Sequence, residues 1–151
     1  MARSYSVFAD GIAAQNSTTV PQAQIVGTAA VRPKIYDLMI GSASTPGDQA
    51  ASWQIKRSST ASTGGTAVTP SPIDPGDPAS TSTAMVAPSM SAPTLGVVLL
   101  QFALNQRATF RWVAAPTKEL VGPATASNGL TFLNTVLTSA FNVSFTIEFE
   151  E

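Results

Sequence analysis

The chain has 151 residues, the size of a single domain that buries roughly two thirds of the surface its unfolded form exposes. Eight basic and nine acidic residues leave the net charge near zero, which argues against binding to the phosphate backbone of a nucleic acid. Charged residues make up only 11% of the chain, about half the usual share, so the protein either tolerates low solubility or has a surface largely covered by partner proteins, which is the favoured interpretation.

Alternation of apolar and polar residues, which is typical of strands buried on one face, recurs along the chain. In chain order, the predicted strands are residues 5–9, 24–29, 34–41 (KIYDLMIG), 52–57 (SWQIKR), 81–86, 107–114 (RATFRWVA), 131–137 and 141–151 (FNVSFTIEFEE). Eleven prolines are spread along the sequence, so no helix longer than two or three turns is expected.

The period of two assigns a face to each side chain of the clearest strands, because successive residues of a strand point to opposite sides. The last strand places five apolar residues on one face: Phe141, Val143, Phe145, Ile147 and Phe149. The other side chains predicted to face the core are Tyr36, Leu38, Ile40, Trp53, Ile55, Phe110 and Trp112. Those predicted to face outward include Asp37, Gln54, Lys56, Thr109 and Arg111.

Residues 96–104 (GVVLLQFAL) form a continuous apolar run, which suits either a buried strand or a short helix. The strand is favoured because Val97, Val98 and Phe102 have a preference for extended structure. Together the elements predict one all-β domain over residues 1–151. The architecture expected is an antiparallel β-sandwich, jelly-roll-like, with about eight strands; a barrel is the alternative.

Residues 58–80 form one long Pro/Gly/Ser/Thr-rich segment between two predicted strands. A loop of this length inside a compact domain is uncommon and is usually either functional or disordered. Its second half, TPSPIDPGDP, is stiffened by four prolines, which lowers the entropy lost on docking. We therefore predict an arm that projects from the sandwich and binds a neighbouring subunit; a mobile, unengaged loop is the alternative.

The residues predicted to bind the partner lie in the stiff half of this segment: Pro70, Pro72, Ile73, Asp74, Pro75 and Asp77. Ile73 is its one large apolar side chain and is the candidate anchor. Because few core contacts are expected to run through the segment, deletion of residues 66–77 is expected to leave the domain folded.

The sequence offers little for catalysis or for metal binding. Histidine and cysteine are absent, so the commonest general base, thiolate nucleophiles, disulfides and zinc–cysteine sites are excluded, and no GxSxG motif occurs. Glu148 and Glu150 share one face of the last strand and are interpreted as the solvated charges of a sheet edge. Asp74 and Asp77 lack the spacing of a calcium loop and are interpreted as turn residues. We expect no enzymatic activity, cofactor or metal.

Four aromatic residues raise the alternative of a carbohydrate-binding platform: Tyr5, Tyr36, Trp53 and Trp112. Three of them, Tyr36, Trp53 and Trp112, fall on the apolar faces of predicted strands, which favours core packing.

The N-terminal segment MARSYSVFADG lacks the apolar region of a signal peptide, and the longest apolar run is far shorter than the ~20 residues that span a bilayer. We therefore expect no export and no membrane association.

Several segments in order carry a family resemblance: RSYSVFADG, KIYDLMIGSASTPGDQAASWQIKR, TGGTAVTPSPIDPGDPASTSTA, FRWVAAPTKELV and NVSFTIEFEE. This order resembles the capsid decoration (cement) proteins of tailed bacteriophages. The resemblance implies a β-sandwich or jelly-roll fold, the major capsid protein as partner, and a place on the virion surface after synthesis in the host cytoplasm. It implies no catalytic residues.

The low charge and the long arm further predict a homo-oligomer, either a trimer or a dimer. A different class of function remains open at this point. The same sandwich would also suit a phage tail or fibre component, or a carbohydrate-binding adhesion module.

Overall fold

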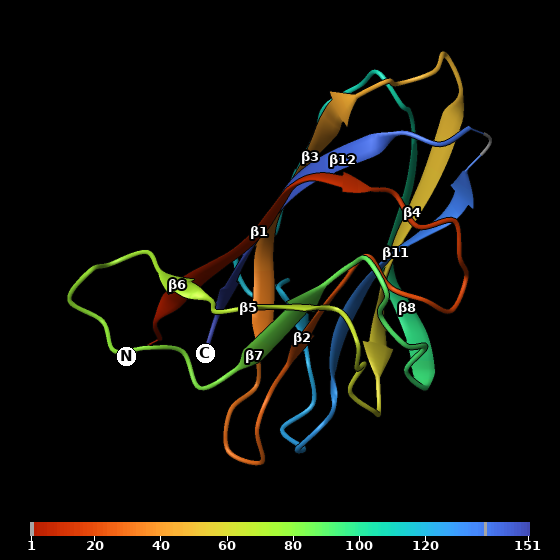
Figure 1. Ribbon diagram of the computed structural model, residues 1–151. Coiled ribbons are helices and arrows are strands. Elements are labelled where there is room, and N and C mark those ends of the chain that lie inside the picture. Colours follow the sequence, from red (N-terminus) through yellow and green to blue (C-terminus); the bar gives the residue numbers. More distant parts are fainter. Residues whose placement is uncertain (1, 138) are drawn as a thin grey trace.

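The computed structural model describes residues 2–137 and 139–151, which form two antiparallel sheets packed face to face as a β-sandwich (Figure 1). Sheet A contains β1 (Ser4–Ala13), β3 (Lys34–Ser44), β6 (Ser71–Pro72), β9 (Phe110–Val113), β10 (Leu120–Val121) and β12 (Asn142–Glu150). Sheet B contains β2 (Ala23–Val26), β4 (Ala50–Ser58), β5 (Thr66–Val68), β7 (Thr83–Val86), β8 (Leu95–Asn105) and β11 (Gly129–Leu137). The predicted all-β sandwich is confirmed.

The order of the strands places long strands in the middle of sheet A and leaves the long strand β8 at one edge of sheet B. In sheet A the order is β10-β3-β12-β1-β6, and β9 also pairs with β3. In sheet B the order is β5-β7-β2-β11-β4-β8. About eight strands were expected; the described chain has more because β5, β6 and β10 are pieces of two or three residues that alternation cannot reveal.

The core lies between the sheets and is built from the faces that the period of two predicts. All five apolar residues assigned to one face of the last strand are buried. Trp53 of β4 stacks on Phe132 of β11 with ring centroids 4.9 Å apart, and Phe145 of β12 meets Phe132 edge-on at 5.5 Å. Phe110 and Trp112 are half-buried and pack against this core. The contact between Phe132 and Phe145 joins sheet B to sheet A.

Tyr36 departs from the prediction because β3 contains a β-bulge. Glu148 of β12 pairs with Asp37, whereas the next residue, Phe149, pairs with Ile35, so Tyr36 is the extra residue. The bulge places Ile35 in the core and leaves Tyr36 half-buried outside it. The neighbouring Asp37 is buried beneath Arg111 of β9, whose Nη2 lies 2.5 Å from its Oδ2.

Two further expectations about strands need correction. The apolar run 96–104 is a strand, as favoured, but it forms the edge strand β8 and exposes Val97 and Val98 instead of being buried. The last strand is not at an edge: β12 lies between β1 and β3, and Glu148 and Glu150 are half-buried on its outer face.

Candidate functional site

The segment predicted as an arm, residues 58–80, connects the two sheets, and we call it together with the next two residues the strap (residues 58–82). It leaves β4 at Ser58 and adds β5 to one edge of sheet B, where Val68 pairs with Ala84 of β7. It then adds β6 to one edge of sheet A, where Pro72 pairs with Tyr5 of β1. In Figure 1 the strap runs from β5 to β6 and then forms a loop beside both chain ends. The expectation of an arm that projects over its full length is therefore wrong.

The start of the strap is fixed by one buried glutamine. The side-chain amide of Gln24 on β2 donates to Ser58 Oγ at 2.8 Å and to the carbonyl of Thr60 at 2.9 Å. Its oxygen accepts a hydrogen bond from the backbone N–H of Ser62 at 2.6 Å. A buried amide is costly unless its groups are paired, so these three bonds favour a single path for the chain.

The six predicted partner-binding residues of the strap differ in their exposure to solvent. Pro70 is buried and Pro72 is half-buried within β6. Ile73, Asp74 and Pro75 are exposed, whereas Asp77 is half-buried. The exposed members of this set all lie in the turn that follows β6, and we call residues 73–77 the strap tip.

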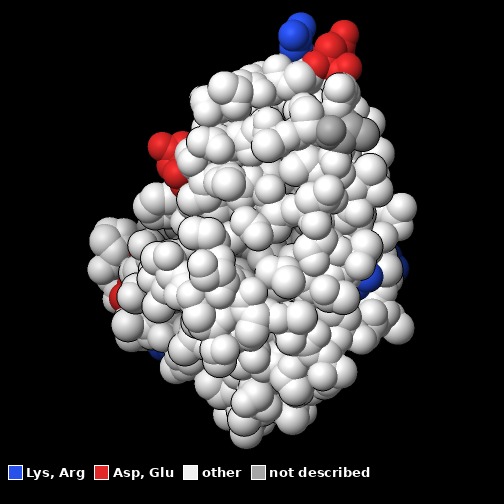
Figure 2. Space-filling view, turned by 45° about the vertical axis from the view of Figure 1, so that its right-hand side comes forward, with Lys and Arg blue, Asp and Glu red and all other residues white. Residues whose placement is uncertain are grey.

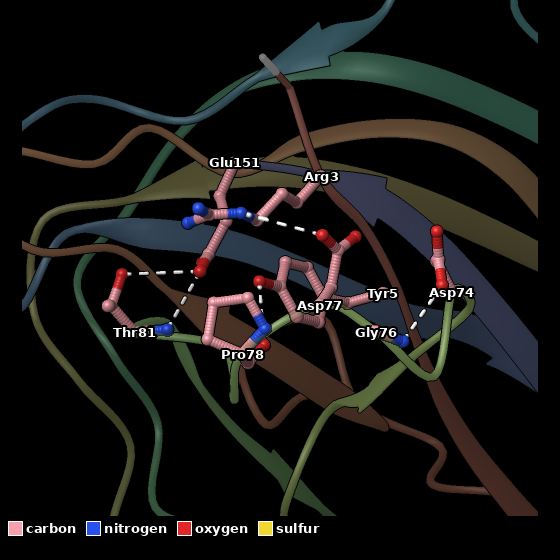
Figure 3. Close-up of polar contacts among 8 residues, drawn as sticks. All are labelled: Arg3, Tyr5, Asp74, Gly76, Asp77, Pro78, Thr81 and Glu151. Carbon is pink, nitrogen blue, oxygen red and sulfur yellow. Dashed lines mark hydrogen bonds and ion pairs between the residues drawn. The ribbon is translucent and has the colours of Figure 1, made fainter.

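The strap tip is held in one shape by its own hydrogen bonds. The carboxylate of Asp74 accepts from the N–H of Gly76 at 2.8 Å, and its carbonyl accepts from the N–H of Asp77 at 3.0 Å (Figure 3). These two bonds make Asp74 the first residue of a tight turn. Asp77 forms an ion pair with Arg3 at 3.6 Å. The interpretation of both aspartates as structural residues is supported, and the part of the chain that the structure describes contains no group of three or more potential metal ligands.

Behind the strap tip, Tyr5 of β1 supports the returning chain. Its side chain is fully buried, and its hydroxyl donates to the carbonyl of Pro78 at 3.1 Å (Figure 3). Burial raises the pKa of Tyr5, and the nearby carboxylate of Glu151 raises it further. The hydroxyl therefore remains a donor at neutral pH, and Pro78 is anchored to the sandwich.

The side-chain carboxylate of Glu151 holds the end of the strap in place by hydrogen bonds. One carboxylate oxygen accepts from the N–H of Thr81 at 2.8 Å, and the other accepts from the N–H of Ser82 at 3.1 Å and from Ser80 Oγ at 3.0 Å. Burial of Glu151 pushes its pKa upward, but the hydrogen bonds from these three residues outweigh that effect and leave the pKa below its ordinary value. No sequence pattern predicted these hydrogen bonds, which we call the clasp, because the alternation placed residue 151 only at the end of a strand.

Replacement of Glu151 by Gln is expected to weaken the clasp in a pH-dependent way. Because the pKa of Glu151 is lowered in the folded state, its ionised carboxylate stabilises the fold at pH values above the ordinary pKa of a glutamate. This contribution is lost as the pH falls through the lower pKa of the folded state. Because the site is partly exposed, the loss at pH 7 should be about 1 kcal/mol. Urea unfolding should show this difference at about pH 7, and the difference should shrink as the pH falls below the ordinary pKa of a glutamate, about 4.3. A difference independent of pH would contradict the clasp.

The aromatic platform considered as an alternative is not assembled from the four residues proposed. Tyr5 and Trp53 are fully buried, and Trp112 packs against the core. A separate open groove of about 550 Å³ lies on sheet A around the exposed Phe8 and includes Met39 and Phe110. None of the residues predicted to bind a partner lies in it. A hollow of about 420 Å³ does lie at the strap tip, between Ile73, Asp77 and the N-terminal residues 2–4.

The described residues include no helix long and apolar enough to cross a bilayer. Comparison with known proteins adds no identification, since no protein-family model, curated protein or solved structure matches this chain.

Proposed function

We propose that the protein is a structural virion component that decorates the outer surface of a bacteriophage capsid and stabilises it by bridging capsid subunits. The observation that carries this proposal is the strap tip, a turn of fixed shape that presents an exposed isoleucine. Ile73 is 49% exposed, yet the backbone on both sides of it is fastened to the sandwich. The capsid is proposed as the partner because the sequence resembles capsid decoration proteins.

The fixed geometry suits a binding element because it reduces the entropy lost on docking. Asp74 closes the turn internally, Arg3 pairs with Asp77, and the N–H of Ile73 donates to the carbonyl of Ser4 at 2.9 Å. Binding therefore does not have to order a mobile loop, which otherwise costs about 0.5–1.5 kcal/mol per immobilised side chain. The free energy gained from burying Ile73 is then available for affinity.

The low charge of the surface also supports a role in assembly. A specific bridge between capsid subunits requires about 1,200–2,000 Å² of buried surface, and the core of such an interface is depleted in charged residues. A chain with 11% charged residues has wide areas that meet this condition. Many such contacts around a shell would resist the separation of its subunits under internal pressure.

Copy number in purified particles tests this function. A decoration protein is expected in hundreds of copies per head, in fixed proportion to the major capsid protein, and particles that lack it should lose DNA at a lower temperature. A tail, fibre or carbohydrate-binding role predicts only a few copies per particle. Quantitative mass spectrometry of purified heads and tails separates these outcomes, and absence from heads would refute the proposal.

Ile73→Ala is expected to reduce the affinity for the shell about tenfold, because truncation of a buried apolar anchor costs about 1–2 kcal/mol. Val136→Ala is the matched control, since Val136 of β11 is an aliphatic residue with the same 49% exposure and lies outside the strap. Occupancy of heads titrated with each variant is the measurement. Equal loss for both variants, or no loss for Ile73→Ala, would exclude the strap tip as the binding element.

A further inference from the structure

The edge of sheet B formed by β8 lacks the charges, the prolines and the short length that normally protect an exposed strand, and its only irregularities lie in its first half. Its sequence, LGVVLLQFALN, contains no charged residue and no proline over eleven residues. Natural edge strands are usually short or carry lysine, proline or an inward-pointing charge, because their free N–H and C=O groups recruit other strands. The opposite edge of the same sheet, β5, follows this rule with only three residues. The unprotected edge is therefore specific to β8.

One half of β8 is regular enough to receive another strand. Irregularities in its pairing with β4 fall between Ile55 and Ser58, opposite the first half of β8. From Leu100 to Asn105, the strand pairs with β4 without a shift. In the first half, Val97 is 59% and Val98 is 45% exposed. The edge thus combines a regular ladder with a neighbouring apolar patch.

Few charged side chains lie beside this edge: Lys56 of β4 pairs with Val98, and Asp48 accepts a hydrogen bond from Asn105 at the end of β8. Figure 2 shows a wide uncharged face on the side of the molecule that carries β4, β8 and β11, with the charged side chains at its margins. Such a face offers no electrostatic attraction to a charged partner. It also imposes no like-charge repulsion when two identical copies approach each other.

From this edge we infer that two copies of the chain associate through their β8 strands, in antiparallel pairing about a two-fold axis. A two-fold axis brings the same strand from each copy into antiparallel alignment, so one edge serves as both donor and acceptor surface. The absence of charge along β8 permits this self-pairing, and the regular half, Leu100–Asn105, supplies the ladder of backbone groups. The result is a single sheet that continues from one copy into the other.

The size of the contact predicts a weak dimer. Eleven residues at about 3.3 Å each give an edge about 36 Å long, and one sheet layer is about 10 Å thick. Pairing of the edges then covers about 700 Å² in total over both copies, below the 1,200 Å² or more of stable specific interfaces. Dissociation is therefore expected at micromolar concentrations, within the range of ordinary solution measurements.

Sedimentation of the intact chain from about 1 to 100 μM tests the pairing. The mass should rise from 15.6 kDa toward twice that value with concentration. Val97→Lys and Ala103→Lys should each raise the dissociation constant at least tenfold, because a lysine on the edge blocks pairing. Val136→Lys, at an exposed valine on β11, should leave it unchanged. A chain that stays monomeric, or a dimer insensitive to both β8 variants, would overturn the inference.

Disulfide cross-linking gives a second readout that does not depend on the stability of the lysine variants. The chain has no cysteine, so a single introduced cysteine can form only an intermolecular disulfide. Cysteines placed in turn at positions 97–105 should cross-link with one maximum along β8, at the residue nearest the two-fold axis. Val113→Cys, at an exposed valine on β9, should not cross-link above background. Equal cross-linking at position 113, or no maximum along β8, would refute the pairing.

Discussion

Deletion of residues 66–77 is expected to lower the melting temperature of the isolated protein by about 10 °C. The deletion removes β5 and β6, the edge strands that the strap adds to the two sheets. It also removes the buried Pro70 and the half-buried Val68, which packs against the core. Lost backbone hydrogen bonds at about 1 kcal/mol each, together with lost apolar burial, amount to about 3–5 kcal/mol. For a chain of this size, each 1 kcal/mol corresponds to about 2–4 °C.

The matched variant for this deletion changes only the strap tip. Ile73→Ala removes exposed atoms and is expected to change the free energy of unfolding by less than about 0.5 kcal/mol. Thermal unfolding followed by circular dichroism measures both proteins. If the deletion were as stable as the intact chain, the strap would contribute nothing to the stability of the fold, which would contradict this account.

Replacement of Phe132 by Ala is expected to destabilise the protein by about 3–5 kcal/mol. Phe132 is 1% exposed and contacts Trp53 from its own sheet and Phe145 from the facing sheet. Removal of its ring leaves a cavity where the two sheets meet. Phe8→Ala is the control, because the ring of Phe8 is 57% exposed and its loss should cost less than about 0.5 kcal/mol. Similar losses in urea unfolding for both variants would contradict the proposed core.

The period of two predicted most of the fold because it reflects a property of each strand alone. A strand buried on one face must alternate, so the core positions of β4 and β12 were readable without knowledge of their partners. Tyr36 was misplaced because a bulge shifts the alternation by one residue, and the bulge exists only in the pairing of β3 with β12. The edge position of β8 was likewise hidden, since an apolar run does not reveal how many of its sides are covered.

The candidate site was predicted only in part for a similar reason. Proline and glycine content correctly placed residues 73–75 on the surface, because those residues favour turns and exclude regular pairing. The attachment of the strap depends on Gln24, Tyr5 and Glu151, which are distant in sequence and carry no local signal. The composition therefore predicted a projecting arm, whereas long-range hydrogen bonds make it a strap with a short presented tip.

A three-dimensional reconstruction of the particles assembled with this protein tests the central claim most directly. The claim is that the strap tip binds a capsid subunit on the outer surface of the head. The predicted result is density for the β-sandwich at repeated positions on the shell, with the side chain of Ile73 buried against the capsid protein. A sandwich found only at the tail, or one bound to the head with Ile73 facing solvent, would contradict the claim.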